Sequence, residues 1–559
     1  MTNRHAGQGA GLEGAPATDQ PGLRAFTAGR KVRLRSPSGQ AAPVRRVKDK
    51  GCHPAGSSRA FFCRRPAVRA AHHERNIMQT IITACKRFFA PRDMTVGKPM
   101  TELIMFSIPL LLGNFAQQLY NAVDAIVVGN YIGDAALGAV GLTFPVLNLM
   151  LALFMGVSTG ASIVVSQAFG SKDRALLSRS VGTIVNVTFW AGLITTVVGV
   201  TLSRPILSLL GTPPEMLQMA GDYLVILFAG ILGCAYFNIL SGVLRGLGDS
   251  VSPLLYLLVA TVLNIGLDIL LVASFGMATD GVALATILAQ GLTAVLCFRR
   301  LTRMRDILTL NRQALRLDKA IARRTIRLGM PAGVTQAIMA LQGVLVQSLM
   351  NSLGAVVVTA TTAVMRVDGF AMMPNFTFGI AATTFSGQNY GARKLARIHQ
   401  GAKDAIWMTL VCASVLTLSI VLFGRQLMSV FTATEAVVNL GADMMRILAL
   451  GYIAFGLTQT MSGVMRGLNE TMAPMWISFI VTIVIRLPLA YGMAWFSRST
   501  AWPNGHPASI FLSLLIAWLA GTAMTAFIYR RGKWRQRAEA ALSQSAPATD
   551  AQAPTPAAE

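Results

Sequence analysis

Residues 241–249 read SGVLRGLGD, and residues 462–470 read SGVMRGLNE. The two stretches lie 221 positions apart, and their flanks agree at the same offset, since residues 167–170 read QAFG and residues 388–391 read QNYG. The match predicts a chain built from two copies of one unit. A repeat of this length is far too long for a solenoid unit, but it is typical of the paired halves of a secondary transporter.

The composition is that of a membrane protein. Of 559 residues, 53% are hydrophobic and only 13% are charged, with a mean hydropathy of +0.53, whereas soluble domains carry about 25% charged residues. A transmembrane helix needs about 20 largely apolar residues. We therefore predict an all-α polytopic membrane protein with twelve transmembrane helices in two pseudo-symmetric six-helix lobes. The predicted spans are 102–130, 138–168, 178–202, 220–244, 252–276, 281–298, 326–350, 356–388, 401–424, 438–465, 472–496 and 508–529.

The positive charge follows membrane topology. The net charge is +25, and an even number of spans places both termini on one side. Loops on that side and the C-terminal tail carry 24 Lys and Arg, whereas the other side carries only Arg204, Arg425 and Arg498. This bias is the positive-inside pattern. It predicts cytoplasmic termini in the inner membrane of a bacterium, contact with the lipid bilayer, and no nucleic-acid partner.

The same pattern predicts the segment boundaries. The predicted segments are a basic, disordered extension at 1–97, an N-lobe at 98–300, a basic cytoplasmic connector at 301–325, a C-lobe at 326–530 and a disordered cytoplasmic tail at 531–559. Both terminal segments lack long apolar runs, as disordered chains do. A sharper hypothesis is that residues 1–77 are not part of the functional protein, because Met78 and Met94 each precede a sensible membrane-protein start.

Embedded polar residues in the first half point to an ion site. A charge at the bilayer centre costs about 2.5–3.5 kcal/mol even on the lenient insertion scale, so such residues are usually functional. Gln117, Asn121 and Asp124 are spaced i, i+4, i+7 and share a helix face, and Asn264 and Asp268 share another. Both acids are expected beyond the midpoint of their spans, at similar depth. We predict that Asp124, Asn264 and Asp268 couple transport to an ion.

The chemistry of this group suits two ions. Neighbouring buried carboxyl groups can hold a proton between them, and carboxylate and amide oxygens also suit sodium. The coupling ion is therefore H+ or Na+, with sodium as the one metal considered. Asn121, Asn238, Thr286 and Gln117 are candidates for lining the ion or substrate path. The alternative for each acid is an interhelical hydrogen bond alone. No catalytic residues and no cofactor are predicted, and no phosphate-binding loop indicates ATP as the energy source.

Charged residues in the second half are interpreted differently. Arg366 and Asp368 are two residues apart and lie on different faces of one helix, so each needs a partner elsewhere. Arg486 could supply one. We interpret Arg366, Asp368 and Arg486 as a structural ion-pair group.

The repeat also predicts which half carries ion coupling. At the repeat offset, Asp124 falls on Val346 and Asp268 falls on Leu489. The scaffold is duplicated but the pair of embedded carboxylates is not. Ion coupling is therefore expected in the N-terminal half.

These motifs resemble one transporter family. Residues 108–114 (IPLLLGN), residues 123–129 (VDAIVVG), residues 387–391 (GQNYG) and the doubled Ser-Gly-Val-x-Arg-Gly-Leu resemble the multidrug and toxic compound extrusion (MATE) family. Asn264 and Asp268 on the fifth span, with Asp124 on the first, are similar to its DinF-like branch. The resemblance covers residues 98–530.

The resemblance implies twelve helices in two lobes about a central cleft, and antiport of cytoplasmic compounds against protons or sodium. Asp124, Asn264 and Asp268 match the ion-linked positions of the branch, and Asn238 and Thr286 are further matches. We expect a monomeric secondary transporter, not an enzyme, that exports cationic or amphipathic small molecules. The alternative is a flippase for lipid-linked oligosaccharides or another metabolite exporter of the same superfamily, which the embedded acids disfavour.

Overall fold

A computed structural model describes residues 90–127, 132, 134–209, 211–432, 434–500, 502–532 and 534–544. The first half contains α2 (Pro99–Val127), α3 (Asp134–Gly170), α4 (Arg174–Leu209), α5 (Pro214–Ala229), α6 (Ile231–Gly246), α7 (Val251–Asp268), the π-helix η2 (Ile269–Ser274) and α8 (Thr279–Arg303). The second half contains α9 (Lys319–Ser352), α10 (Ala355–Gly391), α11 (Leu395–Ser429), α12 (Glu435–Gly467), α13 (Met472–Phe479), the π-helix η3 (Ile480–Arg486), α14 (Leu487–Phe496), α15 (Ala508–Arg531) and α16 (Trp534–Gln544). We refer to α2–α8 as the N-lobe and to α9–α15 as the C-lobe.

These helices confirm the predicted membrane architecture. Eleven helices of the described chain are long and apolar enough to cross a bilayer, and α5 and α6 together form a bent twelfth span. The two helices meet at Gly230 at an angle of 53°. A side chain here would place its Cβ 2.4 Å from Ile287 on α8, so close packing requires glycine. The segment predicted as continuous at 220–244 is therefore bent at Gly230, where it lies against α8.

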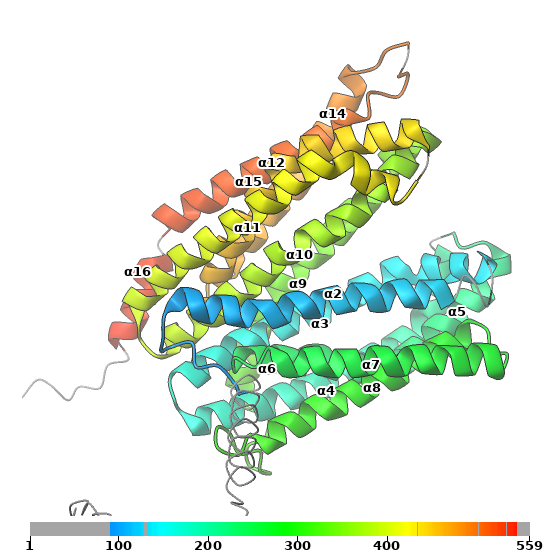
Figure 1. Cartoon of the computed structure of the whole chain (residues 1–559). Coiled ribbons are helices and arrows are strands. Elements are labelled where there is room, and N and C mark those ends of the chain that lie inside the picture. The colour runs from blue at the N-terminus through cyan, green and yellow to red at the C-terminus, as the bar shows by residue number, and fades with distance from the viewer. Residues whose placement is uncertain are drawn as a thin grey trace, which may run out of the picture. The chain divides into compact units, whose positions relative to one another are not determined.

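Each lobe has its own hydrophobic core. One cluster of buried side chains runs from Ala116 to Leu308, and a second runs from Val346 to Phe511. In the C-lobe, α10, α11, α12 and α15 lie side by side (Figure 1) and pack against one another. The separation of the cores agrees with two copies of one unit that each bury their own apolar faces.

Two helices cross from one lobe to the other. The first half of α2 packs against α10 and α11 of the C-lobe, with Leu103 and Phe106 in one buried cluster with Ala381 and Phe385. The first half of α9 packs in turn against α3 of the N-lobe. Since α2 and α9 open their respective repeats, this exchange follows the pseudo-symmetry.

The contact between α3 and α9 depends on glycine. A Cβ at Gly160 would lie 2.2 Å from the carbonyl oxygen of Thr325, and a Cβ at Gly156 would lie 2.8 Å from the Cα of Gly333. Gly329 faces Gly156 at a similar separation, 2.4 Å from a built Cβ to the carbonyl oxygen. Small residues allow such close approach in lipid, where the hydrophobic effect does little to drive helices together.

The end of the segment predicted as a disordered extension is packed. Met94 is fully buried, its backbone N–H donates to Oε1 of Gln388 at 2.9 Å, and its carbonyl accepts from Nδ2 of Asn389 at 3.1 Å. The prediction for 1–97 is thus wrong for its last residues, because Met94 finds an apolar site that a local sequence pattern does not reveal. Residues 1–89 lie outside the described part of the chain.

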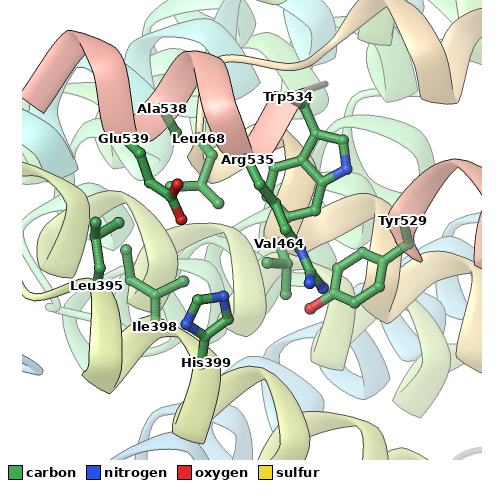
Figure 2. A pocket seen from close by; sticks show the side chains of 10 residues that line it. All are labelled: Leu395, Ile398, His399, Val464, Leu468, Tyr529, Trp534, Arg535, Ala538 and Glu539. Carbon is green, nitrogen blue, oxygen red and sulfur yellow. The ribbon is translucent and has the colours of Figure 1, made fainter. Parts of the chain in front are cut away.

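The tail predicted to be disordered begins with a docked helix. In α16, Trp534 and Ala538 are spaced i, i+4 and are both buried, and Trp534 shares a cluster of buried side chains with Val464. The rings of Trp534 and Tyr529 lie 5.3 Å apart between centroids, and the indole N–H donates to the Ile528 carbonyl at 3.1 Å. Figure 2 shows the small pocket left between α16 and the C-lobe. The prediction of disorder is wrong for residues 534–544, because the burial of Trp534 and Ala538 holds a helix that the composition of the tail does not indicate.

We expect Trp534→Ala to undock α16. Truncating a buried tryptophan typically costs about 3–5 kcal/mol, and the change also removes the indole hydrogen bond to Ile528. Hydrogen exchange should accelerate across α16 while the core of α12 stays protected. Glu539→Gln, at an exposed position on the same helix, should leave the exchange unchanged. Equal protection of α16 in Trp534→Ala would contradict the docking described above.

Candidate functional site

A buried polar face on α7 forms the centre of the N-lobe site. Asn264 and Asp268 are one turn apart, and their exposed fractions are 1% and 0%. Because α7 packs against α2 and α8, its buried face is turned toward these two helices. Asp268 is also the last residue before the π-helical segment η2, and π-helical turns within α-helices are frequent at functional sites.

Several polar atoms on α7 and on the neighbouring helix α8 are poorly satisfied. Both side-chain polar atoms of Asn264, Oγ1 of Thr286 and Oε1 of Gln290 are buried without a hydrogen-bond partner among the described residues. Thr286 and Gln290 are one turn apart on α8. A buried polar group without a partner costs about 1–3 kcal/mol. A bound proton or hard cation would remove this cost, because it would give these oxygens a partner.

The remaining predicted residues of this site differ in what the structure shows. Asn238 on α6 donates to the Cys234 carbonyl at 2.9 Å within its own helix. Gln117 is half-buried on α2. Asn121 and Asp124 belong to the same helix, but their side chains lie outside the described residues, so their roles stay predictions.

Sequence reasoning missed Gln290. Burying a neutral amide costs less free energy than burying the charge of an aspartate, so a glutamine in an apolar helix stands out less in the sequence. The available signal was its spacing of i+4 from Thr286, which places both side chains on one face. The structure brings Thr286 and Gln290 onto a helix packed directly against α7.

The predicted ion-pair group of the C-lobe is arranged differently. Asp368 accepts a hydrogen bond from the Tyr452 hydroxyl. No direct ion pair joins Asp368 to Arg486 in the described chain. Arg486 is buried at the end of η3, and its Nε has no described partner. The described hydrogen-bond partner of Asp368 is therefore the Tyr452 hydroxyl, whereas the sequence analysis expected an arginine.

Arg366 stands apart from this group. It is exposed on α10, one turn before Phe370, whose ring lies 6.0 Å from that of Phe115 on α2. Residues spaced i, i+4 share a face, so Arg366 is on the side of α10 that faces the N-lobe. This position places it on the face of α10 that meets α2 and not in the interior of the C-lobe.

The doubled motifs meet across the lobe boundary. Gln167 Nε2 donates to the Gly467 carbonyl at 2.8 Å, and Gln388 Nε2 donates to the Gly246 carbonyl at 3.1 Å. Each glutamine thus binds the last residue of the doubled helix in the other lobe. The two hydrogen bonds are related by the internal repeat.

Two further glycines complete this contact. A Cβ at Gly170 would lie 1.8 Å from the Gln388 carbonyl oxygen, and a Cβ at Gly391 would lie 2.0 Å from the Gln167 carbonyl oxygen. The backbones therefore touch reciprocally where α3 and α10 end. We call the six residues Gln167, Gly170, Gly246, Gln388, Gly391 and Gly467 the clasp, and this end of the helices the clasp end.

Further contacts between the lobes follow α2 and α10 away from the clasp. Asn114 Nδ2 on α2 donates to Thr377 Oγ1 on α10 at 3.0 Å. Farther along α2 come the ring contact of Phe115 and the amide of Gln118, which would lie 3.3 Å from a Cβ at Gly369. The lobe contacts named here therefore extend from the clasp to just beyond the middle of α2 and α10.

Comparisons with known proteins agree with this arrangement. A family model described as MatE matches residues 109–270 and again residues 331–492, so it matches each lobe once. The chain is 30% identical to the probable multidrug resistance protein YoeA of Bacillus subtilis, over 74% of this chain and 92% of that protein. It is 28% identical to the probable multidrug resistance protein YpnP of the same organism, over 79% and 97%.

A solved structure has the same fold. A MOP superfamily transporter from Pyrococcus furiosus superposes with a TM-score of 0.73 at 23% identity, covering 80% of this chain and 98% of that one. This likeness concerns the path of the backbone.

Proposed function

This chain belongs to the MatE family, the multidrug and toxic compound extrusion transporters, and we propose that it is an antiporter that exports cationic or amphipathic compounds against entering protons or sodium. It is an integral membrane transporter and not an enzyme. The observation that carries the proposal is the buried face of Asn264 and Asp268, next to a helix with two unsatisfied oxygens. Such a face is costly in a purely structural role.

The proposed ion site comprises Asp124, Asn264 and Asp268, with Thr286 and Gln290 as further oxygen donors and Asn121, Asn238 and Gln117 along the path. The presence of an acid on the first span and an Asn–Asp pair on the fifth supports the DinF-like branch. The C-lobe has no counterpart of this pair, since Leu489 and Val346 occupy the equivalent positions. Coupling is therefore assigned to the N-lobe.

We assign the clasp end to the cytoplasm of a bacterial inner membrane. The connector between the lobes and the end of α15 bring the basic residues to this end, as the positive-inside rule requires. In this proposal the clasp blocks the path on the cytoplasmic side, as expected for the outward-open state of alternating access. Transport would require the clasp to open while the outer ends of the lobes approach.

The test of this proposal is export of a fluorescent cationic dye by the full chain in cells that lack other pumps. Export should require an ion gradient, and collapsing the proton and sodium gradients separately should identify the coupling ion. If dye leaves at the same rate with both gradients collapsed, antiport is ruled out.

Arg366 distinguishes this proposal from the flippase alternative. A cation on the side of α10 that faces the N-lobe repels a cationic cargo and attracts an anionic one such as a lipid-linked pyrophosphate. We expect Arg366→Gln to retain or improve export of a cationic dye, by up to about fivefold for about 1 kcal/mol of removed repulsion. Arg446→Gln, in an exposed surface ion pair with Asp443, is the control. Loss of activity in Arg366→Gln alone would favour an anionic cargo.

A further inference from the structure

A groove that the transport function does not use lies where α9 and α13 begin. It has a volume of about 600 Å³. One wall carries three cations of α9, Lys319, Arg323 and Arg327, and the apolar part is made by residues that include Ile326, Met330 and Met472. The groove therefore combines positive charge with an apolar surface.

The three cations form one regular row. Lys319, Arg323 and Arg327 are spaced i, i+4, i+8, so they follow one face of α9 with about 6 Å between neighbours. All three are exposed. In the described chain, none of their side chains makes an ion pair or a hydrogen bond with protein. The row is thus available to an anion from outside the chain.

The apolar residues continue the groove into the membrane-spanning part of α9. Ile326, Met330 and Met472 expose 41%, 62% and 48% of their surfaces. Because α9 is long and apolar enough to cross a bilayer, the groove runs along α9 from Lys319 near the headgroups to Met330, which lies about one turn deeper than Arg327. Ile326 lies beside Arg327 and can contact the upper part of an acyl chain. A free phosphate or a nucleic acid would use the cations but not this surface.

We propose that the groove binds an anionic phospholipid of the leaflet at the clasp end. Its phosphate contacts Arg323 and Arg327, and an acyl chain lies along Ile326, Met330 and Met472. Each basic residue near an anionic membrane surface contributes about a fivefold gain in binding. The site directly precedes Gly329, at which α9 packs against α3, so the lipid braces α9 in the state with the clasp closed.

The test uses the purified full chain and native mass spectrometry. Phosphatidylglycerol and phosphatidylcholine are titrated against wild type, Arg323→Gln/Arg327→Gln, and Arg299→Gln/Arg303→Gln as the matched control. The control removes the same charge at the same i, i+4 spacing from exposed positions at the end of α8. We expect the double variant in the groove to bind phosphatidylglycerol about 30-fold more weakly, and the control to bind like wild type.

A second variant separates the lipid from free phosphate. Ala322 lines the groove, and Ala322→Trp would fill it while all three cations remain. This variant should also lose phosphatidylglycerol, and inorganic phosphate should not displace the lipid from wild type. Equal binding of the two lipids, equal losses in both charge variants, or displacement by inorganic phosphate would each overturn the proposal.

Discussion

Gly170→Ala is expected to disable transport by preventing the clasp from closing. The added Cβ would lie 1.8 Å from the carbonyl oxygen and 2.9 Å from the Cα of Gln388, and backbone atoms cannot rotate away as a flexible side chain can. Forcing extra atoms into a packed contact costs about 1–3 kcal/mol. The population with the clasp closed should therefore fall about 5- to 150-fold relative to the open one.

Ser166 offers a way to measure this shift. It is fully buried at the lobe boundary, where its Oγ would lie 2.1 Å from a Cβ at Gly387. Ser166→Cys, introduced after the six native cysteines are replaced, should resist maleimide while the clasp is closed. Combining it with Gly170→Ala should make it react rapidly, and dye export should fall in parallel.

The repeat provides both a replicate and a control for this experiment. Gly391→Ala should behave like Gly170→Ala, because its Cβ would lie 2.0 Å from the Gln167 carbonyl oxygen. Gly343→Ala on α9 adds a Cβ with nothing within 4 Å and should transport normally. If Gly170→Ala exports dye normally and Ser166→Cys stays protected from maleimide, the clasp does not control closure of the path at this end.

The doubled motif predicted the architecture but not the clasp. Apolar runs predicted twelve spans and the matched motifs predicted a tandem repeat, while helical periodicity indicates which face of a segment is buried. It does not report which element covers that face. Gly246 and Gly467 could be recognised as equivalent, yet their partners Gln388 and Gln167 belong to the opposite lobe, so only the assembled structure identifies the crosswise bonds.

The candidate site was predictable to the extent that it carries charge. Asp268 stands out because an acid in an apolar span is costly, whereas Gln290 gives a weaker signal and was missed. Asp368 was recognised as embedded, but its partner Tyr452 could not be chosen over an arginine, because the choice depends on how α10 and α12 pack. Trp534 was missed for the same reason, since its docking site is formed by distant segments.

Asp268→Asn is expected to abolish ion-driven export while leaving the fold intact. The amide has nearly the shape of the carboxyl group, but it cannot carry a titrating proton or neutralise a sodium ion. One monovalent ion entering down an electrochemical gradient of 100 mV supplies about 2.3 kcal/mol, which corresponds to about a 50-fold concentration ratio. The variant should therefore lose dye accumulation of about 50-fold. It should still let dye reach equal concentrations on the two sides of the membrane.

The experiment uses inverted vesicles that take up a fluorescent cationic dye when a gradient is imposed. Asp443→Asn is the matched control, because this acid forms an exposed ion pair with Arg446 and such pairs contribute about 0–1 kcal/mol. Asn264→Ala should accumulate an amount of dye between those of Asp268→Asn and Asp443→Asn, because it removes an oxygen ligand but no charge. If Asp268→Asn accumulates dye like Asp443→Asn, the buried acid of α7 has a structural role and coupling must be sought at Asp124 or in the C-lobe at Asp368.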